Sequence, residues 1–258
     1  MKTMDKTKIE WCDASWNPIT GCYHGCEYCY ARKMAKRFGE SANCYTVDGN
    51  HIKFGVCDDK PIYEIDRKLN TPYPFGFTPT LHRHKLSQPI KWTRPRTIFV
   101  CSMADLFGQW VPDRWIELVF DFCASAPQHR YLFLTKNPDR YVSLAQRKML
   151  PTGENFWYGS TITDADTPYF FDRSKNKEYN TFISAEPLLK DTGYGECHSD
   201  WLILGAETGN RKGKVVPEKT WIDNICYAAD IERIPVFMKD SLIPIVGEEN
   251  MRREFPWR

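Results

Sequence analysis

The chain has 258 residues, of which 42% are hydrophobic and 14% aromatic, so it can bury a large core and does not resemble a disordered protein. It has no apolar run of the roughly 20 residues that span a bilayer, and its charged N-terminus lacks the apolar stretch of a signal peptide. We therefore expect a cytoplasmic protein without a membrane partner, whose 10 cysteines stay reduced.

The first predicted elements are a short strand at residues 17–20, a loop with three cysteines, and a helix at residues 31–38. The loop reads GCYHGCEYCY, and its cysteines have the spacing C-x3-C-x2-C. Glycines at positions 21 and 25 allow the backbone to wrap closely around a bound group. This loop is the strongest functional signal in the sequence.

Three thiolates on one tight loop can ligate three irons of a [4Fe–4S] cluster and leave the fourth iron open for substrate chemistry. We therefore predict Cys22, Cys26 and Cys29 as the ligands of such a cluster. Two alternatives remain. One is a zinc site with His24 as a fourth ligand, and the other is three unrelated core cysteines.

The next segment, residues 39–96, is rich in Pro, aromatic and polar residues and shows no clear period, so we expect an irregular insertion or lid. Its charge is unusual. Residues 67–96 contain seven Lys and Arg and no Asp or Glu, so this stretch carries +7 within a chain whose net charge is only +2.

From residue 97 onward, short apolar runs alternate with amphipathic stretches, which predicts parallel strands connected by helices. Helices are expected after Pro112, after a capping Asn137, and after Pro217. In such α/β folds the chemistry lies at the carboxyl ends of the strands. The predicted strands are residues 97–101, 131–135, 156–160, 181–185, 201–205 and 235–239.

The cysteine loop resembles the signature of the radical S-adenosylmethionine (SAM) superfamily, in which an aromatic residue, here Tyr28, precedes the third cysteine. Other strings resemble an uncharacterised, phage-associated branch that is itself similar to spore photoproduct lyase. The chain departs from that branch at Cys12, where we expect Thr, and we interpret Cys12 as a packed thiol. The strings that carry the resemblance lie at residues 9–11, 16–22, 102–107, 134–136 and 186–189.

This resemblance implies one domain over residues 1–258, a partial (βα)6-type radical SAM barrel with residues 39–96 as the insertion. It implies a [4Fe–4S] cluster and SAM as cofactors, and an electron donor such as flavodoxin or ferredoxin. In that chemistry an electron from the cluster cleaves SAM to methionine and a 5′-deoxyadenosyl radical. The radical then abstracts a hydrogen atom from the substrate.

The resemblance also implies cofactor-binding residues by position. The main chain at Tyr28 and Tyr30 would contact the adenine of SAM. Ser102 and Asp105 would contact its methionine amino group. Each polar residue could equally be a solvated strand end. Cys101 would return a hydrogen atom to a product radical, as a cysteine does in the lyase, unless it is a small core residue. Candidates for the remaining SAM groups are Lys136, Ser160, Thr163 and Glu186.

The acid-free stretch indicates a nucleic-acid substrate, DNA or RNA, because cations meet phosphates and aromatic rings stack on exposed bases. We expect Arg83, Lys85, Trp92 and Arg94 to contact it. The alternative is a solvated lid that balances the acidic remainder of the chain. Two further hypotheses are the same chemistry on a small metabolite or peptide, and a non-catalytic, metal-stabilised nucleic-acid-binding protein.

Overall fold

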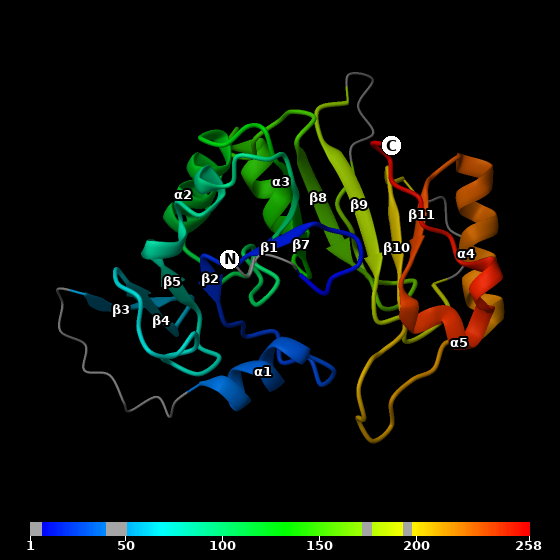
Figure 1. Ribbon diagram of the computed structural model, residues 1–258, viewed down its shortest axis with the longest axis horizontal. Coiled ribbons are helices and arrows are strands. Elements are labelled where there is room, and N and C mark those ends of the chain that lie inside the picture. Colours follow the sequence, from blue (N-terminus) through cyan, green and yellow to red (C-terminus); the bar gives the residue numbers. More distant parts are fainter. Residues whose placement is uncertain (1–6, 40–50, 172–176, 193–197) are drawn as a thin grey trace. The chain divides into compact units, whose positions relative to one another are not determined.

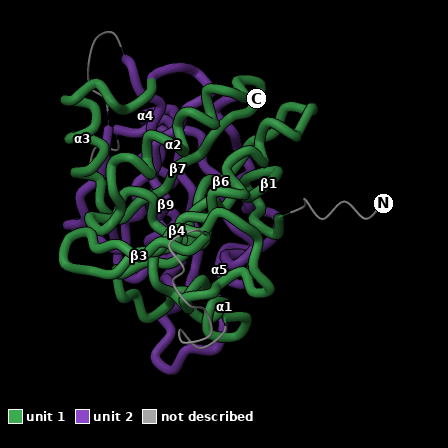
Figure 2. The backbone as a smooth tube through the Cα atoms, turned by 90° about the vertical axis from the view of Figure 1, so that its left-hand side faces the viewer, with its two compact units in different colours: residues 1–151 green, residues 152–258 purple. Residues whose placement is uncertain are grey.

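The computed structural model describes residues 7–39, 51–171, 177–192 and 198–258 (Figure 1). The chain divides into two compact units, residues 1–151 and 152–258, which are coloured separately in Figure 2. Each unit has its own strands and its own buried core. The expectation of one domain over the whole chain stays a prediction, because two compact units can belong to one domain.

The first unit contains three parallel strands in the order β1-β6-β7. The connection from β6 to β7 contains helix α2 (Asp113–Ala124), and helix α3 (Asp139–Gln146) follows β7. Helix α2, which follows Pro112 as predicted, buries an apolar face on which Trp115, Ile116 and Val119 are fully buried. The three strands are β1 (Ala14–Trp16), β6 (Thr97–Val100) and β7 (Arg130–Thr135).

A second sheet in this unit has the order β2-β5-β4-β3. The expectation of an irregular segment is therefore wrong for residues 52–65 and 80–82, where three of these strands lie. Strands β3 and β4 form a hairpin whose turn residues Asp58 and Asp59 both have positive φ, as two-residue hairpin turns require. Pro61 inside β4 hides the strand pattern. The strands are β2 (Ile19–Thr20), β3 (Ile52–Cys57), β4 (Lys60–Ile65) and β5 (Thr80–His82).

Three short helical elements complete this unit. Helix α1 (Tyr30–Phe38) directly follows the cysteine loop, close to its predicted position. Two 3-10 turns follow β5, at Arg83–Lys85 and Pro89–Lys91, and both lie within the basic stretch. Helix α3 begins near its predicted start, but Asn137 does not cap it. The Asn137 side-chain amide instead donates to the carbonyl of Phe107 at 2.9 Å.

The second unit contains four parallel strands in the order β8-β9-β10-β11. Helix α4 (Lys219–Glu232), which follows Pro217 as predicted, connects β10 to β11 and packs Ile222, Ile225 and Ala229 into the core. The described residues between β8 and β10 form no helix, so the predicted strand–helix alternation is wrong there. The strands are β8 (Phe156–Thr161), β9 (Asn180–Ala185), β10 (Leu202–Leu204) and β11 (Val236–Met238).

After β11 the chain forms a 3-10 turn (Asp240–Leu242), helix α5 (Ile243–Val246), another 3-10 turn (Glu248–Asn250) and a C-terminal tail. The fold is therefore mixed α/β with parallel strands in both units, as the sequence predicts. Along the described part of the chain, no helix combines the length and the apolar character that crossing a bilayer demands.

Candidate cysteine-loop site

The cysteine loop is held by main-chain hydrogen bonds to two distant segments of the first unit. The amide of Gly21 donates to the carbonyl of Met103 at 2.9 Å, and the amide of Cys22 donates to the carbonyl of Phe77 at 3.1 Å. Gly21 also forms an isolated bridge with Ala104. The start of the loop is thus fixed between the segment before β5 and the segment after β6.

Gly21 is required at this position for two reasons. Its φ is +90°, in the region that favours glycine. A Cβ atom there would lie 2.4 Å from the carbonyl oxygen of Thr78, well inside van der Waals contact. Gly25 also has positive φ, +77°, but a Cβ there would meet no atom within 4 Å. The two glycines therefore have different roles, close approach at Gly21 and backbone conformation at Gly25.

The three thiols of the loop are free and partly buried. Backbone amides face two of them: His24 donates to Sγ of Cys22 at 3.5 Å, and Arg32 donates to Sγ of Cys29 at 3.4 Å. Cys29 is thereby the N-cap of α1, where a developing negative charge is favoured. Burial first, and then the charge of Asp105, raises the pKa of Cys22 to about 12.

Within the described ranges, no group of three or more His, Cys, Asp or Glu side chains could hold a metal ion. A [4Fe–4S] cluster requires a different arrangement of ligands from a single metal ion. Each cysteine sulfur ligates a different iron, so the sulfurs do not converge on one point. Three free thiols on one loop, two of them facing amide donors, provide a donor set suited to such a cluster.

Lys136, a predicted cofactor residue, lies beside this loop. Its ammonium is 5.5 Å from the ring centroid of Tyr28, which belongs to the same loop. Burial lowers the pKa of Lys136, while the charges of Cys26, Asp105 and the other two loop cysteines act in the opposite direction. The structure therefore places a partly buried lysine beside the loop that carries the predicted ligands.

Asp105 is buried and accepts four hydrogen bonds. The donors to its two oxygens are the His24 ring at 2.7 Å, the Thr135 hydroxyl at 2.8 Å, and the amides of Lys136 and Phe107 at 2.9 and 3.0 Å. Burial acts to raise the pKa of Asp105, but the His24 contact and these other donors outweigh it and lower the pKa. The contact of Asp105 with the methionine amino group stays a prediction, and the carboxylate oxygens already accept hydrogen bonds from protein donors.

Ser102 and Tyr30 lie on the segments that follow β6 and the cysteine loop. The Tyr30 hydroxyl donates to the carbonyl of Ser102 at 2.7 Å. The Ser102 hydroxyl donates to Oδ1 of Asn17 at 3.2 Å, and the amide of Met103 donates to the same oxygen at 2.9 Å. Asn17 positions this segment and is not among the predicted site residues, although it lies within residues 16–22, which carry part of the resemblance.

Cys101 follows β6 directly and is only 2% exposed. Its φ is +59°, which is rare for a residue with a side chain. Burial raises the pKa of its thiol to about 12. The hydrogen-atom donor role stays a prediction, and the burial also fits the small-core-residue alternative.

The comparisons with known proteins give one match. Residues 6–242 match a protein family described as a protein of unknown function, DUF5131. The chain belongs to the DUF5131 family. Among curated proteins and among solved structures, no match is found. The family match therefore covers the cysteine loop and both units but assigns no chemistry.

In the second unit of this DUF5131 protein, Glu186 at the end of β9 pairs with Lys239 at the end of β11. A Cβ on Gly205, which follows β10, would lie 3.1 Å from Lys239 and 3.2 Å from Glu186, so the pair packs over a glycine. Lys239 is a residue that the sequence prediction did not select. The buried Ser160 accepts a hydrogen bond from the amide of Phe170 at 2.9 Å, and Thr163 is partly buried.

The structure gives the four predicted substrate-binding residues of this DUF5131 protein different environments. Arg83 forms ion pairs with Glu64 and Asp66, and Trp92 is buried with its ring against Arg96. These placements favour structural roles for both. Lys85 is partly buried, which lowers its pKa to about 8, and Arg94 is exposed.

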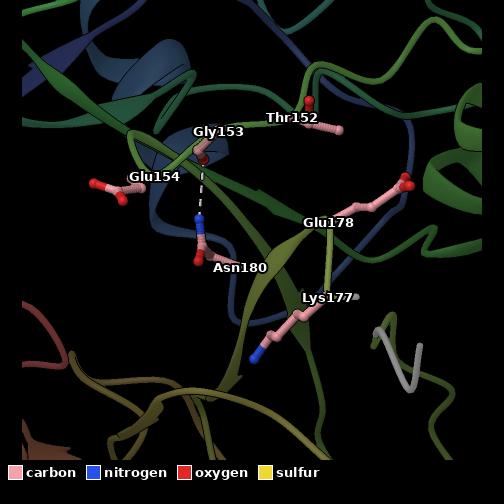
Figure 3. Close-up of a pocket in the computed structure, with 6 residues that line it drawn as sticks. All are labelled: Thr152, Gly153, Glu154, Lys177, Glu178 and Asn180. Atoms are coloured by element: carbon pink, nitrogen blue, oxygen red, sulfur yellow. Dashed lines mark hydrogen bonds between the residues drawn. The ribbon is translucent and has the colours of Figure 1, made fainter. Parts of the chain in front are cut away.

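A pocket of about 490 Å³ lies in the second unit (Figure 3). Its lining residues come from the start of β8 and the start of β9, where the Asn180 amide donates to the carbonyl of Gly153 at 3.0 Å. Ligands of parallel α/β sheets bind at the carboxyl ends of strands. This pocket lies at the amino ends, so we do not assign it to the candidate site. Its lining comprises Thr152, Gly153, Glu154, Lys177, Glu178 and Asn180.

Proposed function

We propose that this protein is a radical SAM enzyme that carries a [4Fe–4S] cluster on Cys22, Cys26 and Cys29. The observation that carries the proposal is the set of three free thiols on one loop, which main-chain hydrogen bonds hold in place and beside whose Tyr28 ring the Lys136 ammonium lies. Reduced thiols need a reducing compartment, so the proposal includes a cytoplasmic location and a donor such as flavodoxin or ferredoxin.

When bound, the cluster would supply the electron that cleaves SAM to methionine and a 5′-deoxyadenosyl radical. The protein would hold and shield the reacting groups. The ammonium of Lys136 is suited to a carboxylate ligand, and the main chain at Tyr28 and Tyr30 would meet an adenine. Further SAM contacts from Ser160, Thr163 and Glu186, on a barrel that includes both units, are part of this proposal.

The proposal is tested by anaerobic reconstitution with iron and sulfide. We expect a brown protein with about four irons per chain, which forms 5′-deoxyadenosine from SAM under dithionite. Replacing Cys22, Cys26 and Cys29 by Ser should abolish both properties. Cys12→Ser is the matched control, since Cys12 lies outside the loop and should leave iron content unchanged. A colourless protein that holds zinc, or a triple variant that keeps its iron, would exclude the proposal.

For the substrate we propose a nucleic acid, supported by the cations of the acid-free stretch that stay exposed. Arg67, Lys68, Lys91 and Arg94 are exposed. Binding of a single-stranded oligonucleotide should weaken steeply with salt, because phosphate contacts release counterions. Changing Lys91 and Arg94 to Gln should reduce the salt slope by about two. No binding at low salt, or an unchanged slope, would favour a small metabolite or peptide substrate.

A further inference from the structure

His24 lies inside the cysteine motif, between Cys22 and Cys26, but its ring is directed to Asp105. Its Nε2 atom lies 2.7 Å from Oδ2 of Asp105. The ring packs edge-on against Trp110, with centroids 4.9 Å apart. The side chain of His24 is 22% exposed and that of Asp105 only 7%, so the hydrogen bond is largely shielded from water.

The Asp105 carboxylate is itself immobilised. The Thr135 hydroxyl, at the end of β7, and the amides of Lys136 and Phe107 donate to it at 2.8 to 3.0 Å. Two of these donors are main-chain groups, whose positions are set by the backbone. The carboxylate is therefore a fixed acceptor, and a side chain that donates to it takes up a fixed position.

The main chain of His24 also contacts the site, because its amide donates to Sγ of Cys22 at 3.5 Å. The same residue thus connects a thiol to a buried carboxylate over a sequence separation of 81 residues. Since Nε2 is engaged with Asp105, this geometry does not favour the zinc alternative in which His24 is a fourth ligand through that nitrogen. Hydrogen-bonded partners of this kind orient metal ligands in many proteins.

We propose that His24 and Asp105 are a positioning pair that holds the backbone between Cys22 and Cys26 in the shape that takes up the cluster. This inference depends on the proposed function only for the identity of the bound group, the cluster. Its effect on the loop itself is a property of the metal-free protein. Neither residue needs to touch substrate.

Three variants and one control test the pair. His24→Phe keeps a ring against Trp110 but loses the hydrogen bond. His24→Gln places an amide donor within reach of the same carboxylate and should restore the wild-type behaviour. Asp105→Asn keeps the shape and removes the charge. Glu64→Gln is the matched control, because it weakens another buried carboxylate network of the same unit without touching the loop.

The first measurement is hydrogen exchange of the metal-free protein. The amides of Cys22 and Cys29 donate to Phe77 and Cys26, so their protection reports the shape of the loop. We expect exchange about 10-fold faster in His24→Phe and Asp105→Asn, and near wild type in His24→Gln and Glu64→Gln. The second measurement is iron loss to a chelator after reconstitution, which should be about 10-fold faster in the same two variants.

The two proposals can fail separately. If the wild type takes up no iron, the proposed function is excluded. The hydrogen-exchange data still show whether His24 and Asp105 hold the shape of the loop. The pair is overturned if His24→Phe exchanges like the wild type, or if Glu64→Gln loosens the loop as strongly. If His24→Phe does not fold, Asp105→Asn is compared with His24→Gln instead. Equal exchange in these two variants would overturn the pair.

Discussion

Glu64 in β4 is a buried carboxylate that joins three elements of the first unit. It accepts hydrogen bonds from the Trp115 indole at 2.8 Å and from the Arg83 guanidinium at 2.7 Å, and it pairs with Arg114. Trp115 and Arg114 belong to α2, and Arg83 begins the first 3-10 turn. One side chain on the hairpin therefore ties the hairpin to a helix and to the basic stretch.

Changing Glu64 to Gln should lower the free energy of unfolding by about 1–3 kcal/mol, because a buried charge-assisted network loses its charge. Urea denaturation followed by tryptophan fluorescence measures this. Asp113→Asn is the control: Asp113 is 36% exposed and pairs with Arg140 and Arg147 near the surface, so its loss should change the stability by less than about 1 kcal/mol. Equal effects of both changes would contradict the assigned role of Glu64.

The same residue predicts a pH dependence. Burial acts to raise the pKa of Glu64, but the hydrogen bonds from Trp115 and Arg83 outweigh it, so the folded-state pKa lies below its usual value. Its contribution to stability should be complete above the unfolded pKa of about 4.3 and be lost as the pH falls through the folded pKa. Urea midpoints measured from pH 6 down to pH 3 should therefore converge for the wild type and Glu64→Gln.

The residues of the candidate site were predictable only in part. Cysteine spacing is a local property, so the sequence could identify Cys22, Cys26 and Cys29, and a strand-end lysine at position 136. The partners of Asp105 and Asn17 are not local, since they come from residues 24, 135 and 102, which only the fold brings near. No sequence pattern shows that His24 donates to a residue 81 positions away.

At the scale of elements, the cysteine loop depends on two glycines with different surroundings. Gly21→Ala should cost about 3 kcal/mol or more and disturb the loop, because its Cβ would meet the Thr78 carbonyl at 2.4 Å. Gly25→Ala should cost only the left-handed backbone penalty of about 1–2 kcal/mol, since its Cβ has open space. Denaturation of both variants checks the difference, and similar losses would contradict it.

Strands and helices with a strong local sequence pattern were predicted correctly. Those that form only through contacts with distant parts of the chain were missed. Buried parallel strands are apolar runs, so β6 to β11 lie close to their predicted positions. Strand β1, only three residues long, forms by pairing with β6 and has no pattern of its own. The β3–β4 hairpin was missed because Pro61 interrupts one strand and two aspartates occupy the turn.

At the scale of the whole molecule, the chain continues past residue 242, where the family match ends, and folds back onto the second unit. The amide of Glu254 donates to the carbonyl of Val236 at 3.0 Å, and Arg253 forms an antiparallel bridge with Phe237. The tail thus covers strand β11. Trp201, which is fully buried, packs against Phe255 and Trp257 with ring centroids 5.7 and 5.0 Å away.

Replacing Phe255 and Trp257 together by Ala should therefore lower the free energy of unfolding by about 2–4 kcal/mol, because it uncovers the ring of Trp201. Thermal unfolding measured by near-UV circular dichroism should show the change, since Trp201 loses its ordered environment. Ile231→Ala, on the exposed face of α4 with 64% of the side chain accessible, serves as control and should change little. An unchanged melting temperature in the double variant would show that the tail is dispensable.

The hydrogen bonds from Gly21 and Cys22 to Met103 and Phe77 have a practical consequence. Because both acceptors are remote in sequence, a synthetic peptide that contains only the cysteine motif lacks them. Such a peptide would have the same three sulfurs but would have to order its backbone at the moment of metal uptake, at a cost in conformational entropy. Moving the motif into another scaffold therefore requires the segments around Phe77 and Met103 as well, because they provide the two carbonyl acceptors. The ten residues of the motif are not enough by themselves.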